Sequence, residues 1–370
     1  MTSTRPLLRL AALLAVLGLV AAACGSDDTD DTATDDTATD DTSSESTDGT
    51  TAGSSGDGTS EDGTTEDGDG ASAVSGTCET ALNEDNSVTS LTELDFSGVT
   101  VNVGSKDFVE QFVLGELAIV GLEAGGATVT DSTNLGGTSV NRDALLAGEI
   151  DTYFEYNGTG WTVHLANEDP SFERDVLTND VCVEDYDRNA VRWVGVSPFN
   201  DTYGFATASD SPAAGLDLQG MADYITENPD ASVCLETEFP NRPDGLVLFE
   251  DATGVVIPDN QIEILDTGVI YDETASGNCT FGEVFTTDGR IPALDLDLVE
   301  DPGVFILYNV SMTMTDALYQ QAPEQFEALA DTILGGLDNE TMAELNQRVS
   351  AGGEDPKAVA TDYLTQQGLL

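Results

Sequence analysis

The stretch VTVNVGSKDFVEQFVLGELAIVGLEAGGATVTDSTN, residues 99–134, decides the fold class of this chain. Residues 99–105 have the pattern of a short strand, and residues 109–123 carry apolar side chains at helical spacing. These apolar positions are Leu114, Leu117, Ala118 and Leu122. Gly125 and Gly126 end the helix, and a strand-like run at 127–134 follows. A strand, a helix and a strand of these lengths predict an α/β fold with a parallel sheet.

The same alternation continues along the chain. A helix is expected at 139–147 and a strand at 150–156. Further strands are expected at 232–235, 261–265, 282–286 and 305–313, and residues 317–369 have a helical pattern broken by paired glycines. We therefore expect two lobes with a cleft between them: lobe I from 76–204 and 307–370, and lobe II from 205–306.

The N-terminus has the pattern of an export signal that ends in a lipobox. Residues 1–23 combine two arginines with an apolar run, and Val-Ala-Ala-Ala precedes Cys24. An uncleaved anchor helix is the alternative, but the apolar run is short for a membrane of about 20 residues' thickness. We expect cleavage before Cys24, lipidation of this cysteine, and a location on the outer face of a bacterial cell membrane.

An acidic segment follows at residues 24–75. Between Gly25 and Gly70 there are 16 Asp or Glu residues and no lysine, arginine, large aliphatic or aromatic residue. Such a segment cannot bury enough apolar surface to fold, so we predict a disordered tether. The whole chain has 70 acidic residues against 11 basic ones, which disfavours nucleic acid as a partner.

Four further cysteines form an even set in an exported chain, which predicts two disulfides. Their spacing matches no zinc pattern and the chain has one histidine, His164, so we predict no metal and no cofactor. Three pairings are open. We favour Cys234 with Cys279, because both precede strand-like runs in the same half of the chain, which leaves Cys78 with Cys182.

Four segments carry a resemblance to a known family. They are GSKDFVEQFVLGEL (104–117), NLGGTSVNRDALLAGEIDTYFEYNGTGW (134–161), FPNRPDGL (239–246) and VFTTDGRIPALDLDLVED (284–301). In this order they resemble the substrate-binding components of ABC importers for osmoprotectants such as glycine betaine, choline and carnitine. The resemblance implies a two-lobed type II periplasmic-binding-protein fold. It also implies an ABC permease with a separate ATPase as partners, and a monomer that is not an enzyme.

A quaternary ammonium group has no N–H to donate, so selective binding depends on cation–π contacts with aromatic faces. Tyr156 ends a predicted strand, and Tyr203 and Tyr308 stand at the expected crossings between the lobes. Tyr271 follows Thr267-Gly268-Val269-Ile270 in lobe II. By resemblance, these four tyrosines match the family's aromatic cage. The alternative is that each tyrosine packs in the core with its hydroxyl hydrogen-bonded.

Charged residues near these positions are candidates to bind the charged groups of the ligand. We expect Asp201 to supply negative charge near the cage, with a turn cap as the alternative. Lys106, after the first strand, and Arg242, in lobe II, are candidate donors to a ligand carboxylate. Thr138 and Gln111 are secondary hydrogen-bond candidates. We assign no role to His164, and expect Arg290 to pair with Asp288.

Two positions depart from the family pattern. Val109 and Asn157 both stand where the family commonly has threonine, and we expect both to touch the ligand face. They leave open which quaternary ammonium compound is bound. Two other functions stay open: a ligand sensor of the same fold, and an exported enzyme, for which the chain has no Gly-x-Ser-x-Gly elbow and no phosphate loop.

Overall fold

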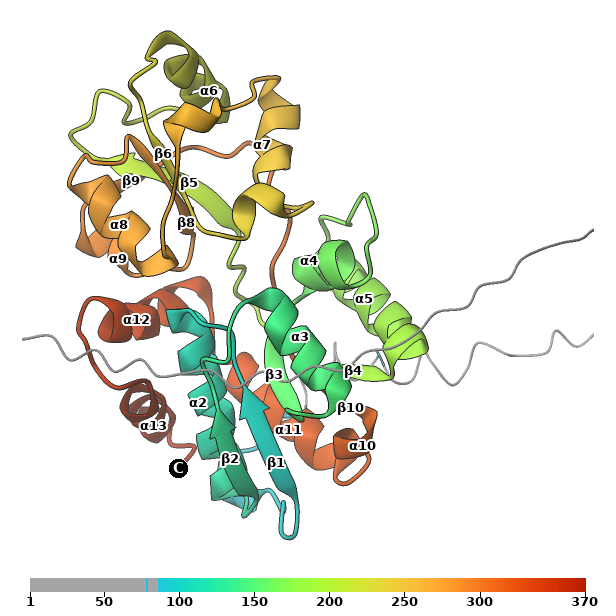
Figure 1. The fold of residues 1–370 in the computed structure, drawn as a ribbon. Helices are drawn as coiled ribbons and strands as arrows, with labels where there is room; N and C mark the ends of the chain where they lie inside the picture. The colour runs from blue at the N-terminus through green and yellow to red at the C-terminus, as the bar shows by residue number, and fades with distance from the viewer. Residues whose placement is uncertain (1–77, 79–85) are drawn as a thin grey trace, which may run out of the picture. The chain divides into compact units, whose positions relative to one another are not determined.

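The computed structural model describes Cys78 and residues 86–370. In this part of the chain, strands form two five-stranded sheets with the orders β2-β1-β3-β10-β4 and β7-β6-β8-β5-β9 (Figure 1). We call the first sheet with its helices lobe I, and the second sheet with its helices lobe II. The expected signal peptide, Cys24 and the whole acidic tether lie outside the described residues and stay predictions.

Lobe I contains the N-terminal and C-terminal parts of the described chain. Its strands are β1 (Thr100–Gly104), β2 (Thr128–Ser132), β3 (Thr152–Tyr156), β4 (Val191–Val194) and β10 (Val310–Thr315). Its helices are α2 (Val109–Ala124), α3 (Thr138–Ala147), α4 (Asn157–Thr159), α5 (Arg174–Asn189), α10 (Asp316–Tyr319), α11 (Pro323–Leu334), α12 (Asn339–Ser350) and α13 (Pro356–Gln366).

Lobe II is formed by the middle of the chain. Its strands are β5 (Tyr203–Ala208), β6 (Val233–Leu235), β7 (Ile262–Ile264), β8 (Phe281–Phe285) and β9 (Leu296–Leu298). Its helices are α6 (Leu218–Glu227), α7 (Leu246–Thr253), α8 (Thr267–Ala275) and α9 (Arg290–Ala293). The chain enters lobe II between β4 and β5 and returns to lobe I between β9 and β10.

The two sheets share one topology. In each, three strands run parallel, and the strand that has just crossed from the other lobe lies antiparallel in the fourth place. This strand is β10 in lobe I and β5 in lobe II, and each pairs on its other side with β4 or β9, again antiparallel. The expected parallel sheet is therefore corrected to a mixed sheet, because a strand that arrives from the neighbouring lobe enters from the opposite end.

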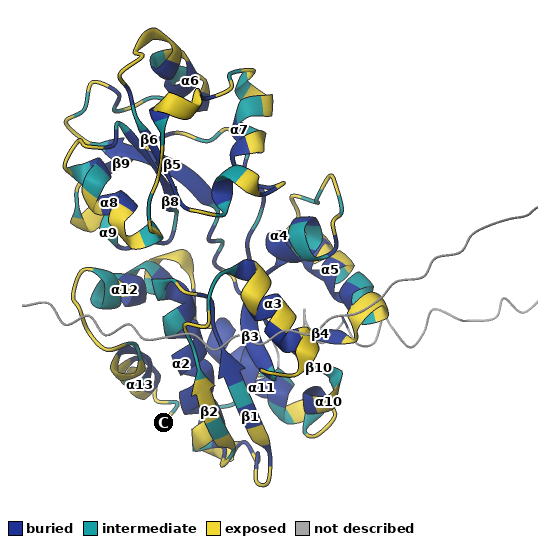
Figure 2. Ribbon diagram, viewed as in Figure 1, coloured by how far each residue is buried: buried dark blue, intermediate teal, exposed yellow. Residues whose placement is uncertain are grey.

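The predicted first unit is confirmed. Helix α2 spans Val109–Ala124 and buries the four predicted apolar side chains against the sheet and the C-terminal helices. Figure 2 shows that the strands of both sheets are mostly buried, whereas β2 at the edge of lobe I is more exposed. Helix α3 and strand β3 also lie where the sequence predicts them.

The predicted strand at 305–313 is wrong in its position, since β10 begins at Val310. Side chains satisfy the backbone donors of the preceding residues. Asp301 accepts hydrogen bonds from the N–H groups of residues 303, 304 and 305, and Asn200 Oδ1 accepts from the Tyr308 N–H at 2.6 Å. These bonds replace the strand ladder and hold the second crossing as a defined turn.

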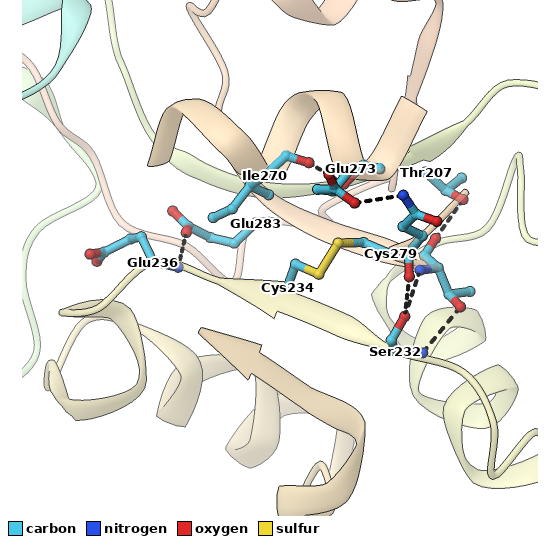
Figure 3. Close-up of a disulfide and its surroundings, with 11 residues drawn as sticks. Thr207, Ser232, Cys234, Glu236, Ile270, Glu273, Cys279 and Glu283 are labelled. Atoms are coloured by element: carbon cyan, nitrogen blue, oxygen red, sulfur yellow. Dashed lines mark hydrogen bonds between the residues drawn. A yellow bond between two sulfur atoms is a disulfide. The ribbon is translucent and has the colours of Figure 1, made fainter. Parts of the chain in front are cut away.

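Both expected disulfides are present. Cys234 in β6 is joined to Cys279, just before β8 (Figure 3). Cys78 is joined to Cys182 in α5. The first bond links two neighbouring elements of lobe II, and the second fastens the N-terminal segment to lobe I.

Candidate ligand-binding site

A cavity of about 430 Å³ is lined by residues of both lobes. Its lining includes seven of the nine predicted ligand-binding residues, which are Lys106, Thr138, Tyr156, Asp201, Tyr203, Arg242 and Tyr308. These side chains come from the ends of strands, from the start of α3, from both crossings and, for Arg242, from the segment between β6 and α7. The volume lies in the range of small-molecule sites.

Five aromatic side chains around this cavity form a closed circuit. They are Phe108, Tyr156, Tyr308, Tyr203 and Phe285, and all five line the cavity. In that order, neighbouring ring centroids are 6.2, 6.4, 5.3 and 5.5 Å apart, and Phe285 returns to Phe108 at 5.0 Å. We call these five residues the aromatic ring.

The sheet topology brings the aromatic ring together. Tyr156 ends β3, Tyr203 begins β5 and Phe285 ends β8, and Tyr203 and Phe285 are direct partners in the antiparallel ladder. Phe108 is the N-cap residue of α2, and Tyr308 lies in the second crossing just before β10. Residues far apart in the sequence therefore meet where both sheets face the cavity.

The aromatic ring has the dimensions for a cation. A regular pentagon with sides of this length has its centre about 5 Å from each corner, within the ~6 Å reach of a cation–π contact. Each such contact contributes roughly 0.5–2 kcal/mol, so several together can bind a cation that donates no hydrogen bond.

Two acidic side chains lie together beside the aromatic ring. The Thr287 hydroxyl is 2.6 Å from Glu110 Oε2 and 2.5 Å from Asp201 Oδ1. A hydroxyl has one hydrogen to donate, so the second short contact requires a protonated carboxyl group. Burial, followed by the nearby Glu110, raises the pKa of Asp201 well above its usual range, and burial also raises the pKa of Glu110.

Hydrogen bonds from neighbouring side chains hold the Glu110–Asp201 pair in place. The Tyr156 hydroxyl donates to Glu110 Oε1 at 2.9 Å, and Asn346 donates to its other oxygen at 3.0 Å. The expectation that Asp201 simply supplies a negative charge therefore needs refinement. Without a ligand, the geometry favours one shared proton on the pair, and a bound cation favours the fully ionised form.

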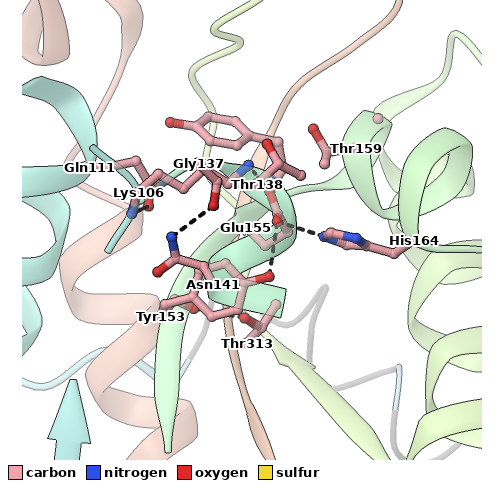
Figure 4. Close-up of polar contacts among 12 residues, drawn as sticks. Lys106, Gln111, Gly137, Thr138, Asn141, Tyr153, Glu155, Thr159, His164 and Thr313 are labelled. Atoms are coloured by element: carbon pink, nitrogen blue, oxygen red, sulfur yellow. Dashed lines mark hydrogen bonds and ion pairs between the residues drawn. The ribbon is translucent and has the colours of Figure 1, made fainter. Parts of the chain in front are cut away.

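Lys106 belongs to a buried network rather than standing as a free cation. Its Nζ lies 2.6 Å from Glu155 Oε1 and 5.0 Å from the centroid of the Tyr156 ring. Glu155 also contacts His164 at 2.7 Å and accepts from the Tyr153 hydroxyl at 2.9 Å (Figure 4). Burial alone would raise the pKa of Glu155, but Lys106 and His164 hold it well below its usual range.

This network corrects the prediction that His164 has no role. Its side chain is buried and fixes the Glu155 carboxylate at the end of β3. No sequence signal indicated the contact, because a lone histidine in a helical segment matches no motif.

Arg242 is also fully engaged. Its Nε and Nη2 donate to the two oxygens of Asp244 at 2.8 Å each, and Nη2 also donates to Thr159 at 3.1 Å. Its Nη1 donates to the Thr138 hydroxyl at 3.1 Å and contacts Glu238 Oε2 at 3.4 Å. All five N–H groups of the guanidinium thus have protein partners, and the contacts with Thr138 and Thr159 join lobe II to lobe I.

Two predicted ligand residues do not line the cavity. Tyr271, on α8, is fully buried in lobe II, with Arg290 stacked 3.9 Å from its centroid and its hydroxyl accepting from the Phe285 N–H. The prediction that Tyr271 joins the cage is therefore wrong. Gln111 is buried on α2, where its Oε1 accepts from the Lys106 N–H at 3.3 Å, so it can act on a ligand only indirectly.

The two departures from the family pattern, Val109 and Asn157, are absent from the lining of the cavity. Val109, however, lines a small hollow beside it, together with Phe108, Asp201 and Phe285. Asn157 Oδ1 accepts from the Asn309 N–H at 2.9 Å, so this side chain braces the second crossing. The expectation that Asn157 touches the ligand face is therefore wrong, and for Val109 it stays a prediction. Arg290, as expected, pairs with Asp288, with Nε 2.9 Å from Oδ1.

The sequence analysis missed several lining residues. Phe108 and Phe285 complete the aromatic ring, and both lie in segments that carried the resemblance. Their positions, just after β1 and at the end of β8, are the sequence signal that could have indicated a place in the cavity lining. Glu236 and Glu238 gave no comparable signal, because in an acidic chain a single carboxylate is uninformative, and Thr159 gave none either.

An aromatic ring enclosed between two α/β lobes of this topology defines a solute-binding protein. The family described as the substrate binding domain of the ABC-type glycine betaine transport system matches residues 99–366, and the chain belongs to this family. Such proteins bind a substrate for an ABC importer outside the cytoplasm, and the family is not enzymatic. Within the described part of the chain, we find no helix that is long and apolar enough to cross a membrane.

Individual relatives agree with this assignment. The chain is 30% identical over 282 residues to the glycine-betaine-binding protein of Pseudomonas aeruginosa, covering 73% of this chain and 89% of that protein. It is 30% identical over 278 residues to the glycine betaine-binding protein YehZ of Escherichia coli, covering 72% and 90%. The solved structure of apo YehZ superimposes with a TM-score of 0.55 over 73% of this chain and 99% of that one.

Proposed function

We propose that this protein binds a quaternary ammonium compound inside the aromatic ring and delivers it to an ABC permease. Five aromatic side chains that line one cavity, from both lobes, are the observation that carries this proposal. Because the ring combines residues of both lobes, a ligand at its centre favours the arrangement in which the lobes meet. The permease, driven by a separate ATPase, recognises that arrangement.

The proposal includes a membrane attachment. Cys24 carries the lipid, residues 24–75 act as the tether, and the folded part works as a monomer on the outer face of the cell membrane. The N-terminal sequence and the family of the folded part support this view together. Metabolic labelling with a palmitate analogue should mark the wild-type chain and leave Cys24→Ser unmarked.

The direct test is calorimetric titration of the unlipidated mature chain with choline, glycine betaine, carnitine and 3,3-dimethylbutanol. The last compound is a neutral isostere of choline, with carbon in place of the ammonium nitrogen. We expect at least one quaternary compound to bind and the neutral isostere to bind at least tenfold more weakly, because cation–π attraction requires the charge. Equal binding of choline and the isostere would contradict an aromatic cation site.

A further inference from the structure

The groups that could bind the carboxylate of a betaine already bind a carboxylate of the protein. Helix α3 begins at Thr138, and its N-cap residue, Gly137, offers no side chain to the free N–H groups. Glu238 reaches this position from lobe II, and its Oε1 accepts from the Thr138 N–H at 2.9 Å. The carboxylate therefore caps a helix of the other lobe.

The Glu238 carboxylate lies close to the cap residue of this helix. A side chain at Gly137 would place its first carbon 2.2 Å from Glu238 Oε1. The Glu238 carboxylate also contacts Arg242 through its second oxygen at 3.4 Å. Glu238 thus holds both a helix N-terminus and a guanidinium, which are the partners that a ligand carboxylate would seek.

No unbalanced positive charge is left in the cavity. Its acidic lining residues are Asp107, Asp201, Glu236, Glu238 and Asp266, and its basic ones are Lys106 and Arg242. Each base is ion-paired with a fully buried carboxylate, Glu155 or Asp244. Among the described residues, the side-chain ammonium of Lys106 donates a hydrogen bond to Glu155. Its remaining N–H groups can donate to a neutral acceptor such as a ligand hydroxyl.

We infer that the ligand of this protein is a quaternary ammonium cation without a carboxylate, such as choline, and that Glu238 excludes the zwitterionic betaines. This inference rests on the proposed function and makes it more specific. A ligand carboxylate must displace Glu238 from Thr138 and Arg242, or share the Lys106 ammonium with Glu155 while lying near the Glu238 charge, and both cost binding free energy. A ligand hydroxyl meets neither obstacle.

The test compares choline and glycine betaine by calorimetry in the unlipidated mature chain and in three variants. Glu238→Ala frees the start of α3 and Arg242, and Glu238→Gln removes the charge but keeps an oxygen that can accept from Thr138. Glu263→Gln removes one acidic charge from an exposed site on β7 and is the matched control. Thermal unfolding of each variant verifies that it folds.

We expect the wild type to bind choline at least tenfold more tightly than betaine, the size of a lost charged hydrogen bond. Glu238→Ala should bind betaine at least tenfold more tightly than the wild type, while its choline affinity changes by less than about threefold. Glu238→Gln should show a smaller gain, and Glu263→Gln none.

Equal affinity of the wild type for choline and betaine would overturn the inference and leave the proposed function intact, with Lys106 as the partner of the carboxylate. A fall in both affinities in Glu238→Ala would overturn it as well, because Glu238 would then act only in holding the lobes together. Absence of binding by any quaternary compound, in the wild type and in Glu238→Ala, would refute the proposed function itself.

Discussion

The aromatic ring and the Arg242 cluster, by which we mean Arg242 and its hydrogen-bond partners, lie at the same cavity. They differ in whether their groups already have partners within the protein when no ligand is bound. The five side chains of the aromatic ring line the cavity, and Lys106 and Arg242 lie over the rings of only two of them, Tyr156 and Tyr203. Every donor of Arg242, in contrast, already has a partner within the protein. We propose that attraction comes from the aromatic ring, and that the Arg242 cluster contributes rigidity and discrimination.

The largest effect is expected from breaking the Arg242 cluster. Arg242→Met should lower the free energy of unfolding by about 3–5 kcal/mol, because it leaves the fully buried Asp244 carboxylate without its partner. Chemical denaturation measures this change. Arg242→Met/Asp244→Asn, which removes the stranded charge, should recover a large part of the loss. A stable single variant would show that the cluster is not a structural unit.

Breaking the aromatic ring should affect binding more than stability. Tyr156→Leu should weaken binding of the cationic ligand by roughly 10- to 100-fold, since it removes one aromatic face and the hydrogen bond to Glu110. Tyr156→Phe keeps the face and should lose less than Tyr156→Leu. If the two variants bind equally, the hydroxyl and not the ring face is what matters at this position.

The acids beside the aromatic ring should make cation binding depend on pH. The pKa of Asp201 is raised by burial and by Glu110, so the ligand-free pair holds a proton that a cation displaces. Affinity should therefore rise with pH by up to about tenfold per unit, until the ligand-free pair is ionised. Titrations in buffers of different ionisation enthalpy would detect the released proton, and Asp201→Asn should abolish the dependence.

A smaller effect should come from an acid outside the cavity. Burial, and then Asp131, raise the pKa of Glu116 on α2 to about 7. The folded state therefore loses stability as pH rises from about 4.5 through 7. Glu116→Gln should be neutral at pH 4 and stabilising by about 1 kcal/mol at pH 8, with ligand affinity unchanged. A stability gain that is the same at both pH values would contradict this assignment.

The sequence could predict the local elements and much of the cavity, but not its long-range pairings. Hydrophobic spacing located α2, the end of a predicted strand located Tyr156, and the expected first crossing located Tyr203. The sequence did not predict the position of Tyr271, because both faces of a short helix such as α8 offer plausible environments for a tyrosine. Packing decides between these faces. The partners of Lys106 and Arg242 depend on how distant segments meet, which no local pattern records.

The antiparallel strand in each sheet has a consequence for the order of folding. In lobe I, β10 fills the place between β3 and β4, and the Thr152 hydroxyl donates there to the backbone carbonyl of Thr313, 161 residues further along the chain. As the polypeptide is synthesised, this sheet stays divided into two pieces until the whole of lobe II has been made. Lobe II needs no later residue for its own sheet, so it can form first and serve as the partner against which lobe I closes.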